Sequence, residues 1–198
     1  MWQETISEES NAQTRKRRLP PRKQCAPRLE LRRHLTKSEI DAMVSATRIS
    51  GAHGLRNALL ILLAYRHALR VSELLALTWS DINLEDLSIH IRRKNNGTSS
   101  THQLNATEAG WLCRLRRAAS DSSNYVFCSD KGLPLARRTA HFIISKAAEQ
   151  ARIDVGVHPH MLRHARAFHL VSKGLDTRRL QAYMGHRNAK HTLVYVRQ

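Results

Sequence analysis

The sequence predicts an α+β fold that is mostly helical and carries one small antiparallel sheet. Thr36 and Glu39 have the spacing of a capping box, which marks the start of a helix. The stretch 55–69 is rich in apolar residues and free of Pro and Gly, and it is too long for a strand, so it predicts a buried helix. Residues 87–91 alternate between apolar and polar, and the Asn-Gly dipeptide at 96–97 then favours a hairpin turn.

The remaining elements follow from capping residues and from glycines near helix ends. Asn105 and Glu108 repeat the capping-box spacing and open another helix. In chain order, we expect helices over 37–46, 55–69 and 71–77, antiparallel strands over 88–92 and 99–104, a helix over 105–119, a short strand over 125–128, and helices over 136–151, 160–173 and 177–184.

The 198 residues have room for one ordinary domain and an appendage. Residues 1–33 are polar, include the basic run Arg15-Lys16-Arg17-Arg18, and offer almost nothing to bury, so we expect a disordered basic arm there. A solvated leader without a role would have the same composition. The folded domain is then expected over 34–198.

The charge of the chain favours nucleic acid as a partner. Lys and Arg number 33 against 16 Asp and Glu, which gives a formal net charge of +17. The 3 cysteines are odd in number and form no Cys-x-x-Cys, which argues against a disulfide framework and a zinc finger. The longest apolar run, 58–64, is far shorter than the ~20 residues that span a bilayer. We therefore expect a cytoplasmic protein with no membrane contact.

His160, Arg163 and His164 share one face of an expected helix, because they have i, i+3, i+4 spacing. The two histidines could bind zinc, although Arg163 opposes a cation and the sequence specifies no third ligand. The three side chains could also be solvated or cap the core. A phosphate site is a third interpretation, since Arg163 can bind two phosphate oxygens while a neighbouring histidine moves a proton.

Two further groups are ambiguous by themselves. Gly185-His186 is followed nine positions later by Tyr195, and a lone tyrosine near the end of a chain is typically a packing residue. Arg70 follows the long apolar stretch, and Glu73 could simply form an ion pair with it.

Four segments occur in a fixed order: Ala68-Leu69-Arg70-Val71-Ser72-Glu73-Leu74, His160-x-x-Arg163-His164, Gly185-His186 and Tyr195. In order and spacing they resemble the tyrosine recombinase (phage integrase) family. The segments 64–67, 158–164 and 185–188 are most similar to the small fimbrial phase-variation recombinases of that family. The resemblance covers about residues 35–198 and implies the mostly helical catalytic domain of these enzymes.

The resemblance implies a role for each matching residue. Tyr195 would attack a DNA phosphate and form a 3′-phosphotyrosyl intermediate, while Arg70 and Arg163 hold the non-bridging oxygens. His160 would assist proton transfer at the nucleophile, and His186 would donate a hydrogen bond to the phosphate. No metal or other cofactor is implied, because cationic side chains stabilise the charge.

The family's general acid is a lysine in the β-hairpin, and here the sequence departs from the family pattern. Related sequences place this lysine directly before Asn-Gly, whereas this chain has Asn95 at that position and Lys94 one residue earlier. A one-residue offset in a strand turns a side chain to the other face. Lys94 is still the residue we expect to act as the acid. Glu73 and His164 are expected to orient groups around the site. The other basic residues are expected to contact the phosphate backbone or to lie on a solvated face, and they include Arg92, Arg93, Arg137, Arg138 and Lys146.

The expected function is site-specific recombination of double-stranded DNA, with inversion of a segment that controls fimbrial gene expression. The resemblance implies a homotetramer assembled on paired DNA sites, and it adds DNA-bending accessory proteins as candidate partners. Two alternatives stay open: a DNA-binding regulator with the same fold and weak or no cleavage, and a metal-dependent nuclease. Three residues follow Tyr195, so we also expect the segment around it to be mobile and the free protein to be monomeric.

Overall fold

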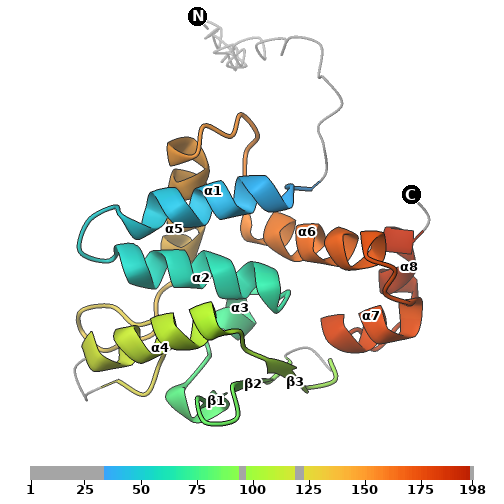
Figure 1. Cartoon of the computed structure of the whole chain (residues 1–198), viewed down its shortest axis with the longest axis horizontal. Helices are drawn as coiled ribbons and strands as arrows, with labels where there is room; N and C mark the ends of the chain where they lie inside the picture. The colour runs from blue at the N-terminus through green and yellow to red at the C-terminus, as the bar shows by residue number, and fades with distance from the viewer. Residues whose placement is uncertain (1–33, 94–96, 119–122, 197–198) are drawn as a thin grey trace, which may run out of the picture. The chain divides into compact units, whose positions relative to one another are not determined.

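The structure is a computed structural model that describes residues 34–93, 97–118 and 123–196. The expected basic arm over 1–33 and the candidate acid Lys94 lie outside the described residues. In the described part, the chain is mostly helical with one small antiparallel sheet, as predicted (Figure 1). None of the helices described is both long and apolar enough to cross a membrane.

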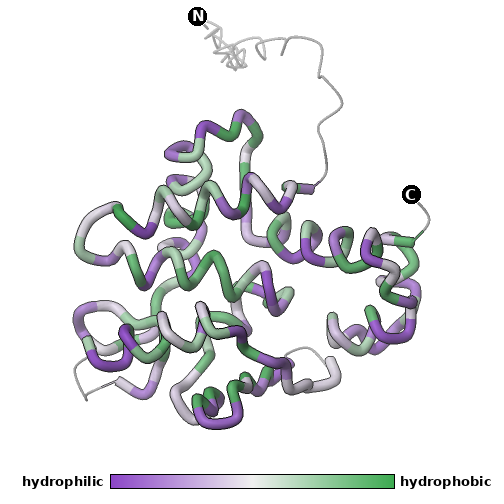
Figure 2. Tube along the Cα trace, in the orientation of Figure 1, coloured by the Kyte–Doolittle hydropathy of each residue, from purple (hydrophilic) through white to green (hydrophobic). Residues whose placement is uncertain are grey.

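Helix α2, over Gly54–Arg66, lies at the centre of the main core. Helices α1 (Lys37–Arg48), α4 (Ala106–Ala118) and α6 (Pro159–Ser172) all pack against it. The apolar stretch of α2 is visible in Figure 2, and its Leu and Ile side chains at 59–61 and 63 are fully buried. Each such burial contributes about 2 kcal/mol relative to an exposed side chain. The predicted buried helix is therefore confirmed.

Both predicted capping boxes are present. The Thr36 hydroxyl accepts a hydrogen bond from the Glu39 backbone N–H at 3.3 Å, and the Glu39 carboxylate accepts one from the Thr36 N–H at 2.7 Å. The Asn105 side chain and the Glu108 carboxylate make the same exchange at 2.8 and 2.9 Å. These bonds satisfy N–H groups that have no partner within the helix, and they set where α1 and α4 begin.

The sheet has three described strands in the order β1-β2-β3, all antiparallel. Strands β2 (Ser88–Ile91) and β3 (Ser100–Gln103) lie within the predicted ranges. The one-turn helix η1 (Trp79–Asp81) and strand β1 (Ile82–Asn83) were not predicted, because elements this short show no periodicity. The predicted strand over 125–128 is wrong: Tyr125 and Cys128 each form a single bridge rather than a ladder.

The C-terminal part of the chain packs beside α6. The short helix α3 spans Val71–Leu74, and α5 spans Arg137–Gln150 and packs against α1. Helices α7 (Thr177–Met184) and α8 (Lys190–Val196) lie against each other and against α6 (Figure 1). Helix α8 was not predicted from the sequence. A second cluster of buried residues holds this part together and comprises Ala68, Ala167, Leu180, Met184 and Tyr195.

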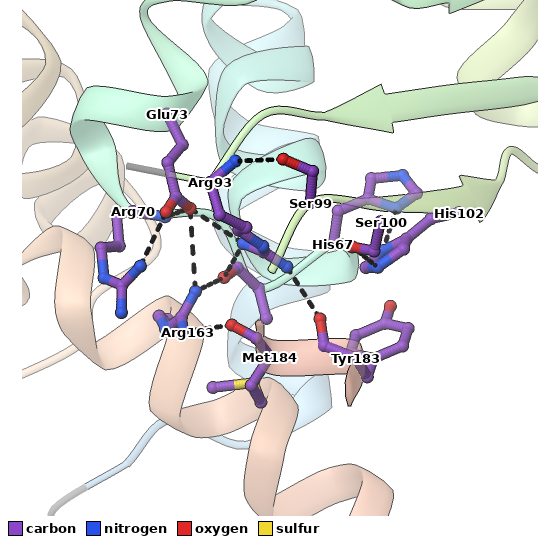
Figure 3. A network of polar contacts seen from close by, with 11 residues as sticks. His67, Arg70, Glu73, Arg93, Ser99, Ser100, His102, Arg163, Tyr183 and Met184 are labelled. Carbon is purple, nitrogen blue, oxygen red and sulfur yellow. Dashed lines mark hydrogen bonds and ion pairs between the residues drawn. The ribbon is translucent and has the colours of Figure 1, made fainter. Parts of the chain in front are cut away.

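A buried ring cluster ties the sheet to α2 and α7. His102 of β3 has its Nδ1 atom 3.4 Å from Nδ1 of His67, and its ring stacks on Tyr183 with centroids 4.2 Å apart (Figure 3). Its Nε2 atom lies 3.0 Å from the Ser100 hydroxyl. Burial, with smaller contributions from His67 and nearby arginines, lowers the pKa of His102 to about 3. At neutral pH this ring is therefore uncharged.

The lowered pKa of His102 predicts that acid destabilises the fold. Between about pH 6.5, where an unfolded histidine titrates, and pH 3, the unfolded chain binds a proton that the folded chain does not. As the pH is lowered through this range, the free energy of unfolding should therefore decrease by about 1.4 kcal/mol per pH unit for this group alone. Urea titrations between pH 7 and 5 should show a shallower pH dependence for His102→Gln than for the parent chain.

The matched control for that measurement is His90→Gln, because His90 is exposed on the neighbouring strand β2. An equal pH dependence for His102→Gln and His90→Gln would show that His102 is not the group responsible.

Candidate active site

A buried carboxylate, that of Glu73, organises the centre of the site (Figure 3). Arg70 is the N-cap of α3 and Glu73 occupies the N3 position, so the Glu73 carboxylate accepts the Arg70 backbone N–H at 3.0 Å and its guanidinium at 2.7 Å. Glu73 is 3% exposed. Burial alone would raise the pKa of Glu73, but the Arg70 N–H and the charge of Arg93 outweigh it, so the pKa is lowered. Glu73 is an anion at neutral pH.

Arg93, at the end of β2, is a site residue that the sequence analysis did not identify. We expected Arg92 and Arg93 to contact DNA phosphates. Instead the Arg93 side chain is 0% exposed, and its guanidinium donates to Glu73 at 2.8 Å and to the Tyr183 carbonyl at 2.7 Å. Arg92 is exposed and pairs with Asp81. The alternation of side chains along a strand could have predicted the burial of Arg93, since position 93 shares a face with the buried residues Ile89 and Ile91.

Arg163, on α6, is the third guanidinium near Glu73 among the described residues. It donates to the carbonyls of Ala68 and, at 2.6 Å, Met184, and it lies 3.8 Å from the Glu73 carboxylate. The Ala68 carbonyl is presented by a sharp turn after α2, in which Ala68 takes a φ of 50°. This turn ends α2 at Arg66, earlier than predicted.

The three arginines outnumber the one carboxylate that they share. Burial, followed by the charges of Arg93 and Arg70, lowers the pKa of Arg163 to about 9, which still leaves it charged at pH 7. Three cations against one anion leave a local excess of positive charge in a partly dry site. Such an excess attracts an anionic partner.

Two glycines let the hairpin and α7 approach Arg93. Gly185 ends α7 with a φ of 63°, and a Cβ there would lie 2.7 Å from the Arg93 Nε atom. A Cβ on Gly97 would lie 2.8 Å from the Arg93 Cβ and 2.9 Å from the Gly185 carbonyl. Only glycine fits such contacts without a shift of the backbone. The hairpin is thereby held beside the segment that carries His186.

His186 follows Gly185 and faces the C-terminal helix. Its Nδ1 atom lies 3.0 Å from the hydroxyl of Thr192, which is itself buried on α8. Its ring is nearly parallel to that of Tyr195, at 10° with centroids 6.5 Å apart. Burial, followed by the charges of Arg163 and Arg70, lowers the pKa of His186 to about 4. The ring is therefore neutral at pH 7.

Tyr195 lies on α8 and is 5% exposed. Its hydroxyl is 2.7 Å from the Nδ1 atom of His164 on α6, and the Phe168 ring meets it edge-on at 5.2 Å. Burial raises the pKa of Tyr195 above its ordinary value, although Arg163 and Arg70 act against that rise. We expected a loosely held segment here; the structure instead packs Tyr195 into a small core.

His160 lies in the first turn of α6, and its side chain is exposed. Its ring is 6.4 Å from that of His164. Burial of part of the ring, followed by His158 and Arg163, lowers the pKa of His160. His164, rather than His160, makes the hydrogen bond to the Tyr195 hydroxyl.

A cleft of about 590 Å³ opens beside these residues. It is lined by Arg70, Gly97, Gln181, Gly185, His186, Arg187, Asn188, Ala189 and His191. Of the sequence-predicted residues, Arg70 and His186 line this cleft. Tyr195 lies buried beside His186, Arg163 lies buried against the Met184 carbonyl, and His160 is at the start of α6. No group of three or more His, Cys, Asp or Glu residues within the described ranges is arranged to hold a metal ion.

The sequence is similar to known DNA recombination proteins and to regulators of fimbriae. The sequence model of the phage integrase family matches residues 33–198. The type 1 fimbriae regulatory protein FimE of Escherichia coli strain K12 is 43% identical over 170 residues, which cover 83% of this chain and 85% of FimE. FimB of the same strain is 41% identical over 169 residues, which cover 83% of this chain and 84% of FimB.

Solved structures share the fold. XerA recombinase superposes with a TM-score of 0.73 at 23% identity, over 83% of this chain and 60% of XerA. The pre-cleavage complex of XerH site-specific recombinase bound to its difH substrate has a TM-score of 0.71 at 24% identity, over 84% of this chain and 50% of XerH. This chain therefore spans only part of the length of both recombinases.

The contacts of Arg93 predict a large effect on stability. Arg93→Met should lower the free energy of unfolding by about 3 kcal/mol, because it removes one partner of a buried ion pair and leaves the Tyr183 carbonyl without its donor. Arg138→Met, on the exposed side of α5, is the control and should change it by less than about 0.5 kcal/mol. Urea unfolding measures both; equal stabilities would refute the structural role of Arg93.

Proposed function

This chain belongs to the phage integrase family of tyrosine recombinases, and we propose that it cleaves and rejoins DNA through a covalent bond between Tyr195 and a 3′ phosphate. The observation that carries this proposal is the position of Tyr195 beside His186, which lines the same cleft as Arg70. A DNA phosphate in that cleft meets a nucleophile, a neutral hydrogen-bond donor and fixed positive charge together.

We assign the charge stabilisation to Arg70 and Arg163. Arg70 lines the cleft with 28% of its side chain exposed, so it can contact a phosphate while Glu73 holds its orientation. Arg163 is fixed by two backbone carbonyls and contributes its positive charge from a buried position. Because both groups are already in place, they stabilise the extra negative charge of the five-coordinate phosphorus without reorganising.

We assign the hydrogen bond to the phosphate to His186. When the Thr192 hydroxyl donates to Nδ1, the neutral ring carries its hydrogen on Nε2 and can donate it to a phosphate oxygen. The lowered pKa supports this role, since the ring needs no second proton to be a donor.

In the proposed cleavage step, the Tyr195 oxygen forms a bond to phosphorus and loses its proton, while the bond from phosphorus to the 5′ oxygen breaks. The leaving 5′ oxygen takes a proton, which we assign to Lys94. Rejoining reverses these events on a new 5′ hydroxyl. The phosphodiester energy stays in the protein–DNA bond, so no nucleotide cofactor or metal ion is needed.

The similarity to FimE and FimB supports a role in fimbrial phase variation. We propose that the chain inverts a DNA segment that controls fimbrial gene expression, working in the cytoplasm as a homotetramer on paired sites with DNA-bending proteins. The net charge of +17 fits a partner made of phosphates. The basic residues over 1–33 are proposed to contact the DNA backbone without reading bases.

Tyr195→Phe tests the nucleophile. The variant should bind DNA with nearly unchanged affinity, because it loses one oxygen and keeps the packing against Phe168, but it should form no covalent adduct with a nicked DNA site. Gel electrophoresis under denaturing conditions detects the adduct. An adduct in the Phe variant would remove Tyr195 from the mechanism, and its absence in the parent chain would favour a DNA-binding regulator.

Arg70→Ala tests the charge stabilisation. Cleavage of the nicked site should slow by about 100- to 1,000-fold, as when an oxyanion donor is removed from other enzymes. Arg117→Ala, which removes one positive charge from the exposed side of α4, is the matched control. If the two variants cleave at equal rates, Arg70 contributes only general charge and not a contact to the reacting phosphate.

A further inference from the structure

We propose that His164 is the proton acceptor for Tyr195 during DNA cleavage. This inference rests on the proposed function, in which Tyr195 is the nucleophile. It assigns to His164 the step that the family resemblance assigns to His160, and it follows from which imidazole is in contact with the reacting oxygen.

The contact between His164 and Tyr195 is direct. The Nδ1 atom of His164 and the Tyr195 hydroxyl are 2.7 Å apart, within the range in which a proton can pass between them. The two rings are 5.6 Å apart between centroids. His160, one turn earlier on α6, has an exposed side chain, and its ring neighbours are His158 and His164.

The surroundings hold both partners in place. Residue 164 directly follows Arg163, whose guanidinium is bound to the carbonyls of Ala68 and Met184, so this turn of α6 is anchored. The Tyr195 ring is packed edge-on against Phe168, also on α6. The same helix therefore supplies the acceptor and part of the wall that positions the nucleophile.

The directions of the pKa shifts of His164 and Tyr195 suit a base and its proton donor. Burial lowers the pKa of His164, and so do the charges that face it: His160, Arg163 and His158 on α6 and at its N-terminus, and His34 before α1. Burial raises the pKa of Tyr195, which faces His164 from α8. At neutral pH the phenol therefore keeps its proton and the imidazole keeps a free lone pair on one nitrogen. In the tautomer that carries its hydrogen on Nε2, the Tyr195 hydroxyl donates and Nδ1 of His164 accepts.

The proton balance of the step is complete. As the Tyr195 oxygen bonds to phosphorus, its proton passes to Nδ1 of His164, and the electron pair of the broken bond goes to the 5′ oxygen, which is protonated separately. His164 is then an imidazolium next to Arg163, a repulsive arrangement that favours return of the proton. When the strand is rejoined, the proton returns to the leaving tyrosine oxygen.

His164→Asn is the informative variant, because the Asn oxygen can take the place of Nδ1 as a hydrogen-bond acceptor but cannot accept a proton at neutral pH. His169→Gln, five residues further along the same helix, is the matched control. Single-turnover cleavage of a nicked DNA site should slow by about 100-fold or more in His164→Asn and remain near the parent rate in His169→Gln. DNA binding and urea stability of each variant are measured alongside, to show that the folded site is retained.

A second substrate distinguishes proton transfer from the nucleophile from proton transfer to the leaving group. When sulfur replaces the bridging 5′ oxygen, the leaving group needs no proton, so a variant that lacks the general acid regains cleavage. The His164→Asn defect should persist with this substrate, and its cleavage rate should rise with pH as Tyr195 ionises. If the sulfur substrate restores cleavage by His164→Asn, His164 acts at the leaving group instead. If His164→Asn cleaves faster than the parent chain, the hydrogen bond restrains Tyr195 rather than activating it. Either result overturns the proposal.

These outcomes are separate from a failure of the proposed function itself. If the parent chain forms no adduct at Tyr195, the nucleophile assignment fails for every variant. If the parent forms the adduct and His164→Asn forms it equally fast, the nucleophile assignment holds and the role of His164 is refuted.

Discussion

The structure of the site depends on one buried carboxylate shared by three arginines. Glu73 is bound by Arg70 and Arg93, and Arg163 lies 3.8 Å away, so elements from distant parts of the chain meet at one anion. Removing a carboxylate from water is costly, and the ion pairs and the Arg70 N–H offset that cost only while all of them stay in place. The ends of α2, β2, α6 and α7 are therefore fixed relative to one another by charge as well as by packing.

The same arrangement accounts for why the site suits a phosphate. One arginine paired with one carboxylate would have no net charge. Three guanidinium groups around a single carboxylate instead leave positive charge that an incoming anion can neutralise. Arg70 is the member that remains partly exposed at the cleft, and the other two are held by backbone carbonyls. Structural support and the proposed phosphate binding are thus divided among residues of the same chemical type.

Tyr195, the proposed nucleophile, is held by a different set of contacts. Tyr195 packs against Phe168, shares a hydrogen bond with His164 and lies beside His186, all within a small cluster formed by α6, α7 and α8. This cluster is separate from the main core around α2. The arginines that we propose bind phosphate are therefore positioned by the main fold, whereas Tyr195 belongs to the smaller C-terminal cluster, which α6 connects to the main fold.

The sequence by itself determined the helices with clear signals, such as α1 and α4 with their capping boxes, and it placed Arg70, Arg163, His186 and Tyr195 in one candidate site. It could not identify Arg93, because a buried and an exposed arginine look alike until strand facing and the approach of Gly185 are known. The resemblance assigned proton transfer at the nucleophile to His160 and only an orienting role to His164, and the helix face that the two residues share gave no reason to revise this. The tertiary structure decided between them, because the packing of α8 against α6 brings the Tyr195 hydroxyl to one imidazole and not the other.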